Sequence, residues 1–155
     1  MRPVSRILLL VAAVLCAACS EPSGRENFVP RDSVGEDGRY CFSAAMTDTL
    51  ASYSLRLYTR TDCSDREFAA MRDMGMDVLA VAPSGKEYSE RVYIPKSSFR
   101  SGRFPAHDCD VPYRTGFRPA ESGIWKIYLK PVPETEPAGL RGMGLSISKK
   151  KNGKR

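Results

Sequence analysis

The densest group of potential metal ligands in the sequence is His107-Asp108-Cys109-Asp110, which contains the only histidine of the chain. Neighbouring side chains in an extended segment point to opposite sides, so these residues cannot easily converge on one ion. The sequence offers no second Cys/His cluster at zinc spacing. Calcium held by Asp108 and Asp110 with backbone carbonyls is an alternative, but two carboxylates fall short of a calcium-binding loop. We therefore expect a solvated loop here, with no metal and no cofactor.

Ser146 and Lys149 have the Ser-x-x-Lys spacing of penicillin-recognising enzymes. In those enzymes a helical turn brings the lysine over the serine, whereas the alternating pattern here predicts a strand, which separates the two side chains. Gly-x-Ser-x-Gly and phosphate-loop motifs do not occur in the sequence. We therefore expect a protein that is not an enzyme. The alternative is an unrecognised hydrolase, because the carboxylate pair of a glycosidase can come from distant strands.

Cys19 is the residue for which the sequence indicates a covalent modification. Two arginines precede an apolar run, residues 7–18, which ends in two alanines just before this cysteine. The arrangement resembles a bacterial lipobox, in which cleavage before the cysteine accompanies its acylation. A 12-residue helix would cover about 18 Å, too little for the roughly 30 Å core of a membrane. We expect residues 1–18 to be a lipoprotein signal peptide; the alternative is ordinary cleavage after Ser20, which gives a soluble secreted protein.

Lipidation would hold the folded part of the chain at a membrane surface, facing water. Serine at position 20, in place of aspartate, resembles the pattern of lipoproteins sent to the outer membrane of double-membraned bacteria. We therefore expect a lipid-anchored outer-membrane protein that faces the periplasm or the cell surface.

The formal net charge of +6 is unevenly distributed along the chain. Arg2 and Arg6 belong to the expected signal peptide, and five further basic residues lie within 149–155. The body between these ends is close to neutral, so it lacks the broad cationic face that binding to nucleic acid requires. We expect no nucleic-acid partner.

Export would expose the remaining cysteines to an oxidising compartment, where disulfides form. Cys63 and Cys109 are the expected pair because both lie in polar, turn-like surroundings, whereas Cys41 lies in an apolar strand pattern. Such a bridge would contribute about 4 kcal/mol by the chain-entropy model. Cys41 is expected to be free or an alternative partner, since sequence does not fix the pairing.

The chain after the signal peptide reads as a tether and one β domain. Residues 19–38, which begin with the expected lipidated cysteine, are polar and broken by Pro and Gly, as in a flexible linker. The capping-box spacing that begins at Ser64 predicts one short helix over 65–73. Period-two alternation predicts strands at 39–46, 53–60, 76–82, 87–94, 124–132 and 143–149. We predict a single antiparallel β-sandwich of about seven or eight strands over 39–149, followed by a basic tail at 150–155.

Tyrosines could supply a recognition surface on this sandwich. Tyr58, Tyr93, Tyr113 and Tyr128 fall on or near outward-facing strand positions, and aromatic faces suit sugars and peptides. Trp125 is expected in the core. A surface module that binds glycan through these tyrosines, or calcium through Asp108 and Asp110, is the alternative functional hypothesis.

The order of these features resembles the gliding-motility lipoprotein family GldH of Bacteroidetes over roughly residues 40–149. The resemblance is carried by Asp48 with 53–60, by the 83–86 turn, by 117–125 and by the closing stretch 140–149. It implies a non-enzymatic envelope lipoprotein of the gliding and type IX secretion apparatus. Such a protein would act as a scaffold or adaptor, with the membrane and other envelope lipoproteins or secretion and motility proteins as partners.

Overall fold

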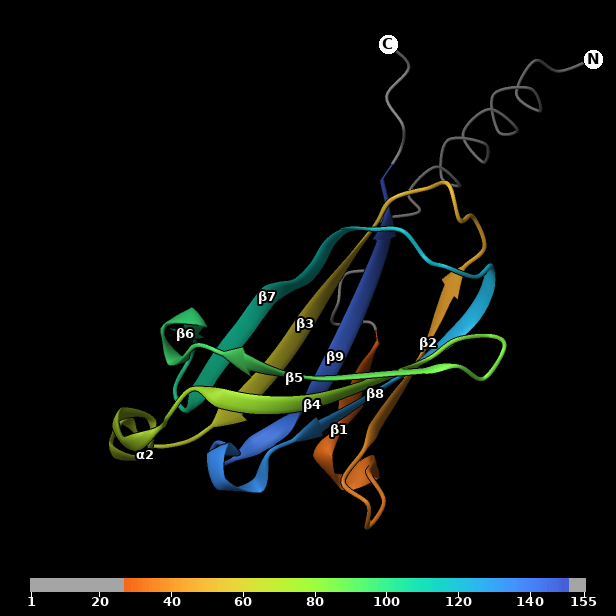
Figure 1. The fold of residues 1–155 in the computed structure, drawn as a ribbon. Coiled ribbons are helices and arrows are strands. Elements are labelled where there is room, and N and C mark those ends of the chain that lie inside the picture. Colours follow the sequence, from red (N-terminus) through yellow and green to blue (C-terminus); the bar gives the residue numbers. More distant parts are fainter. Residues whose placement is uncertain (1–26, 151–155) are drawn as a thin grey trace, which may run out of the picture.

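The computed structural model describes residues 27–150, which form two antiparallel β-sheets packed face to face (Figure 1). One sheet has the strand order β1-β9-β3-β7-β6, and the other has the order β2-β8-β4-β5. The strands are β1 Phe28–Pro30, β2 Tyr40–Met46, β3 Tyr53–Asp62, β4 Met74–Val81, β5 Glu87–Ile94, β6 Phe99–Ser101, β7 Ala106–Phe117, β8 Gly123–Pro131 and β9 Leu140–Lys149. The predicted all-β sandwich is confirmed, with nine strands in the described residues.

The core lies between the sheets because apolar and polar residues alternate along the strands. In β2, buried and exposed residues alternate from Tyr40 to Met46 without interruption. Its neighbour β8 turns Trp125, Ile127 and Leu129 into the same core. Burying these side chains removes apolar surface from water, and each Å² removed stabilises the fold by about 25 cal/mol. This is the main contribution that favours the packing of the two sheets.

The predicted reversal at residues 83–86 is present and joins β4 to β5. The amide of Ala82 donates to the carbonyl of Lys86, and the amide of Gly85 donates to the carbonyl of Ala82, each at 2.8 Å. Gly85 has a φ of 89°, a conformation that suits glycine. The hairpin pairs in unbroken register from Val81 opposite Glu87 onward.

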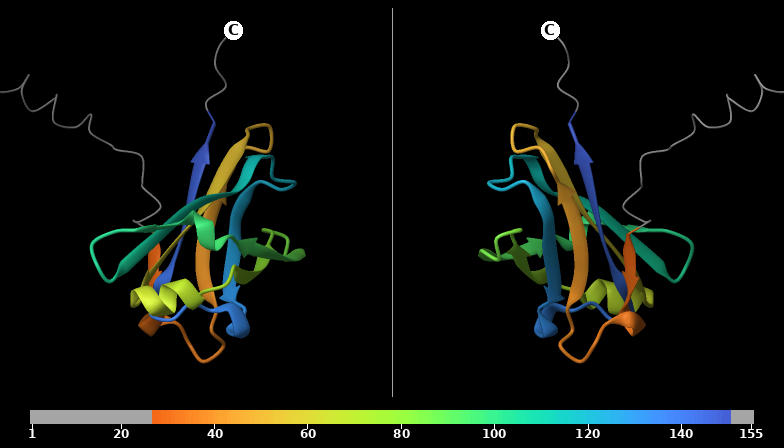
Figure 2. Two further views of the ribbon diagram at one scale, coloured as in Figure 1. Left: turned by 90° about the vertical axis from the view of Figure 1, so that its left-hand side faces the viewer. Right: turned by 90° about the vertical axis from the view of Figure 1, so that its right-hand side faces the viewer.

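The predicted helix exists but is shorter than expected. The α-helix α2 runs Asp65–Ala70, and Ser64 and Glu67 form the expected capping box. Met71 is already extended, because the chain must straighten before it enters β4. α2 lies at the end of the sandwich opposite the C-terminal end of β9 (Figure 2). Within the described residues, no helix has the length and apolar character needed to cross a membrane.

The predicted tether extends too far into the chain, because the described fold already includes β1. Phe28 lies opposite Gly144 and Pro30 lies opposite Gly142, so β1 pairs with β9. The Phe28 ring also packs against the Tyr58 ring in a T-shaped arrangement, with the centroids 5.8 Å apart. The boundary expected at residues 38–39 is therefore wrong, while the predicted signal peptide, Cys19 and most of the basic tail lie outside the described residues.

The strand β7 was not predicted, and it replaces the loop expected around His107. It is 12 residues long and contains Pro112 and Gly116, two residue types that usually interrupt strands. Its register against β3 shifts twice between Tyr53 and Arg56. Such shifts bend a strand and increase its twist.

Candidate functional site

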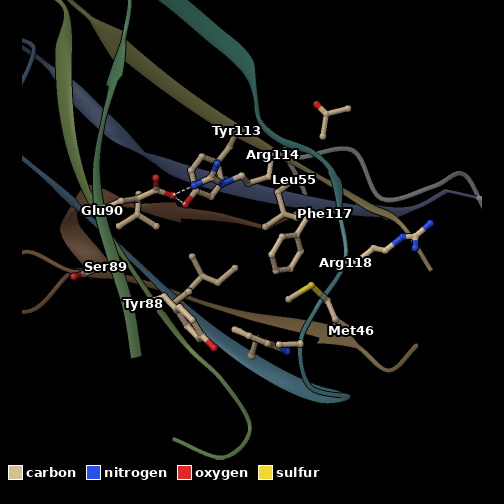
Figure 3. Close-up of a pocket in the computed structure, with 15 residues that line it drawn as sticks. Met46, Leu55, Tyr88, Ser89, Glu90, Tyr113, Arg114, Phe117 and Arg118 are labelled. Carbon is tan, nitrogen blue, oxygen red and sulfur yellow. Dashed lines mark hydrogen bonds and ion pairs between the residues drawn. The ribbon is translucent and has the colours of Figure 1, made fainter. Parts of the chain in front are cut away.

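A cleft of about 540 Å³ opens between the two sheets where β5 and the C-terminal half of β7 face each other (Figure 3). The floor is apolar and comes from both layers of the sandwich. Its principal side chains are Met46, Leu55, Val78, Phe117, Trp125 and Ile127. The cleft is therefore an accessible extension of the hydrophobic core.

The cleft exists because both sheets end beside it. β5 is the outer strand of the four-stranded sheet. β6 covers β7 only opposite residues 107–109, so among the described strands nothing pairs with the rest of that edge. Pro112 lies in this uncovered part, and a proline is tolerated there because an edge strand need not donate every amide. The result is an opening along one side of the core.

Trp125 is the central aromatic residue of the cleft. Its ring contacts Tyr88, at a centroid distance of 5.9 Å, and Phe117, at 6.3 Å in an edge-to-face arrangement. The indole Nε1 donates to the carbonyl of Glu121 at 3.1 Å, so the polar atom of the ring is already bonded. The indole, 3% exposed, therefore contributes only a small apolar surface to the cleft and no free polar atom.

Glu90 closes one end of the cleft by joining the two sheets. Its carboxylate accepts a hydrogen bond from the Tyr113 hydroxyl and pairs with Arg114 Nη2 at 2.6 Å (Figure 3). Partial burial raises the pKa of Glu90, but the bonds from Tyr113 and Arg114 outweigh that effect, and the pKa lies below its ordinary value. Burial and the neighbouring carboxylate both raise the pKa of Tyr113. The group thus holds a carboxylate and a neutral phenol in one hydrogen-bonded cluster.

Arg118 supplies the uncompensated charge of the cleft. Three charged residues line the cleft, and two of them, Glu90 and Arg114, neutralise each other. Arg118 is exposed at the rim and has no ion pair in the part of the chain that the structure describes. An apolar floor with a positive rim suits a ligand that is itself apolar at one end and anionic at the other.

His107, expected in a solvated loop, lies instead in the interior, 4% exposed. Its ring stacks on Phe68 of α2 with the centroids 4.0 Å apart, and Nδ1 is 3.2 Å from the Ser101 hydroxyl. Asp108 and Asp110 point to the other face of β7, where Asp108 accepts from Tyr58 at 2.7 Å and Asp110 pairs with Arg56 at 2.9 Å. The described residues contain no cluster of three or more potential metal ligands.

The expected disulfide between Cys63 and Cys109 is not formed in the structure, where both are buried free thiols. Cys109 lies opposite Thr59 on β3, whereas the amide of Cys63 donates to Pro105. Four residues of strand separate these positions, or roughly 13 Å, well beyond the roughly 7 Å limit between the Cα atoms of a disulfide. Burial raises the pKa of the Cys109 thiol to about 12. Cys41 is a free, exposed thiol on the outer face of β2.

The four tyrosines do not form one recognition surface. Tyr58 lies on the outer face of the five-stranded sheet under Phe28, whereas Tyr128 lies in β8 on the outer face of the other sheet. Tyr113 lines the cleft, and Tyr93 is exposed on β5. Only Tyr113 belongs to a defined site.

Ser146 and Lys149 do not form a catalytic pair either. Ser146 lies opposite Arg56 within β9, and the Lys149 ammonium forms an ion pair with Asp48 at 2.7 Å. The two residues of the Ser-x-x-Lys spacing therefore have separate partners and do not form a site together.

The residues of the cleft were largely missed at the sequence level. One signal was present: Tyr88, Glu90, Val92 and Ile94 share the inward face of β5, so an acidic residue stands among apolar ones. A buried charge requires a partner, and this position could have directed attention to the facing strand.

No protein-family model, curated protein or solved structure matches this chain. The geometry of the described residues is therefore the basis for the functional proposal.

Proposed function

We propose that this chain is a lipid-anchored adaptor of the bacterial cell envelope, which acts by binding a second envelope component in the cleft between its sheets. The observation that carries the proposal is the cleft itself, a cavity of about 540 Å³ with an apolar lining around Trp125 and charged residues at its rim. Exposed apolar concavities of this size are the usual form of a ligand site. The lipobox-like sequence before Cys19 supports the anchor.

Binding is favoured over catalysis by the surroundings of the polar groups. The carboxylate of Glu90 is engaged by Tyr113 and Arg114, and the imidazole of His107 is buried against Phe68. A general base has to reach the proton it removes. Glycan and calcium binding are less favoured, because the tyrosines are dispersed and the Asp108 and Asp110 carboxylates bond to neighbouring side chains.

The resemblance to the GldH family adds the expectation that the adaptor works within the gliding or type IX secretion machinery. An anchored domain with such a cleft suits a protein that holds an envelope component near the membrane. Serine at position 20 supports the outer membrane as its location.

Fractionation of cells that express the full chain tests the anchor. Wild-type protein is expected in the membrane fraction with an acyl modification on Cys19, and Cys19→Ser is expected to lose both. Cross-linked complexes of the wild type, Ala80→Leu and Ala45→Leu then test the cleft. Ala80 lines the cleft and Ala45 is exposed on the outer face of β2, so only Ala80→Leu should lose the bound component. A Cys19→Ser protein that stays acylated and membrane-bound, or equal capture by both alanine variants, would contradict the proposal.

A further inference from the structure

We infer that the cleft binds a long-chain amphiphile with an anionic head group, its chain on the Trp125 floor and its head group at Arg118. The inference rests on the proposed function, because both place the bound component in this cleft. It adds the chemical class of the ligand, which the sequence does not indicate.

The interior of the cleft favours an apolar chain over a polar ligand. The indole Nε1 of Trp125 already donates to Glu121, and the carboxylate of Glu90 is taken up by Tyr113 and Arg114. A peptide backbone laid on this floor would bury amides and carbonyls without partners, whereas an acyl chain has none to satisfy. The volume of about 540 Å³ falls in the usual range of small-molecule sites.

Both bordering strands are poorly suited to accept a peptide as an added strand. The uncovered edge of β7 contains Pro112, which cannot donate a hydrogen bond, and its register shifts opposite Leu55. The edge strand β5 carries Glu90 as an inward-facing charge, a feature that discourages strand addition. These features disfavour an extended peptide.

The net charge at the rim of the cleft favours an anionic head group over a cationic one. Glu90 and Arg114 neutralise each other, which leaves Arg118 as the net charge of the lining. Figure 3 shows Arg118 on the side of Phe117 away from Glu90, with its guanidinium pointing away from both. An acyl chain that lies in the cleft between Glu90 and Arg118 would therefore place its carboxylate or phosphate beside Arg118, where opposite charges attract.

Trp125 provides a direct measurement, because it is the only tryptophan of the chain and it lies on the cleft floor. The full chain carrying Cys19→Ser is titrated with dibromostearate below its micelle concentration, and Trp125 fluorescence is followed. Bromine quenches only at close range, so chains bound elsewhere leave the signal unchanged. Saturable quenching is expected for the fatty acid and weaker quenching for its uncharged methyl ester.

Two pairs of variants separate the chain site from the head-group site. Ala80→Leu should weaken binding about tenfold by filling the cleft, and Ala45→Leu, on the outer face, should not. Arg118→Glu should weaken binding of the acid about fivefold with little effect on the ester, and Arg103→Glu, an exposed charge in a turn, should not. Thermal unfolding of each variant shows that the fold is retained. Equal quenching of all the variants would overturn the inference.

Vesicles identify the source of the ligand. Quenching by dibrominated phosphatidylglycerol vesicles, with none from phosphatidylcholine, assigns a phospholipid, whereas quenching by the fatty acid alone assigns a free acid. If neither the fatty acid nor either kind of vesicle quenches Trp125, the inference that the cleft binds an amphiphile is wrong. If Ala80→Leu still lost the cross-linked envelope component in that case, the proposed function would stand with a different ligand.

Discussion

The hydroxyl of Tyr113 donates to the carboxylate of Glu90, and this bond joins the free edge of β7 to the free edge of β5. The bond closes one end of the cleft, whose lining includes several residues of the buried core: Met46, Leu55, Val78, Trp125 and Ile127. Arg114 pairs with the same carboxylate, so the junction has both a neutral and a charged donor. The bond therefore holds the two sheets together at the end of a cleft that is continuous with the core.

Glu90→Gln is expected to destabilise the fold by about 1 kcal/mol, because it removes the charge that Tyr113 and Arg114 engage at a half-exposed site. Denaturant unfolding at neutral pH measures the effect. Glu87→Gln is the matched control, since Glu87 is exposed on the same strand and forms no ion pair within the described residues. Equal effects of the two substitutions would contradict this role of Glu90.

Acid should remove the contribution of Glu90. Its pKa in the folded chain lies below the ordinary value of 4.5, so the carboxylate stabilises the fold above that pH. The stabilisation is lost as the pH falls through the folded-state pKa. The difference in unfolding free energy between wild type and Glu90→Gln should therefore shrink from about pH 5 to about pH 3. A difference that stayed constant over this range would show that the carboxylate charge is not what matters.

Local features were predicted well from the sequence because their determinants lie a few residues apart. The turn at 83–86 carries its own glycine, and the capping box needs only Ser64 and Glu67. Alternation along β2 and β8 fixes which side chains are buried whatever strand lies beside them. These features were enough for the fold class.

Features that depend on distant partners could not be predicted in the same way. Pro112 and Gly116 suggest a break, yet β7 continues because β3 pairs with it along most of its length. Cys63 and Cys109 look alike in sequence, and only the register shows that they are far apart. The bond between Glu90 and Tyr113 joins strands whose proximity follows from the packing of two sheets.

Gly139→Ala should destabilise the fold by about 2–4 kcal/mol. Gly139 has a φ of 67°, and a Cβ there would lie 1.9 Å from the carbonyl oxygen of Asp62. Its own carbonyl accepts from the amide of Asp62 at 2.9 Å, so the backbone cannot withdraw without losing that bond. Chemical denaturation measures the loss. Gly35→Ala is the control, since its Cβ would meet Asp37 only at 3.6 Å, and a similar loss there would contradict this explanation.

Ser64→Ala should cost about 1 kcal/mol of stability through the loss of the N-cap of α2. The hydroxyl of Ser64 accepts from the amide of Glu67 at 3.3 Å, and Glu67 in turn accepts from the amide of Ser64 at 2.8 Å. Ser97→Ala provides the control, because Ser97 is exposed and has no side-chain hydrogen bond in the described part of the chain. Thermal unfolding compares the two variants. No difference between them would mean that packing alone holds α2.

Thiol alkylation of the native protein should distinguish the described cysteines by their burial. Cys41 is exposed and should react rapidly at about pH 8, whereas Cys63 and Cys109 are buried and should react only after unfolding. Burial raises the pKa of Cys63 and brings that of Cys109 to about 12, so the reactive thiolate is scarce at both sites. Mass spectrometry of the alkylated peptides, digested without reduction, reads out all three sites. A peptide in which Cys63 is linked to Cys109 would contradict the register of β3 and β7, because four residues of strand separate the two positions.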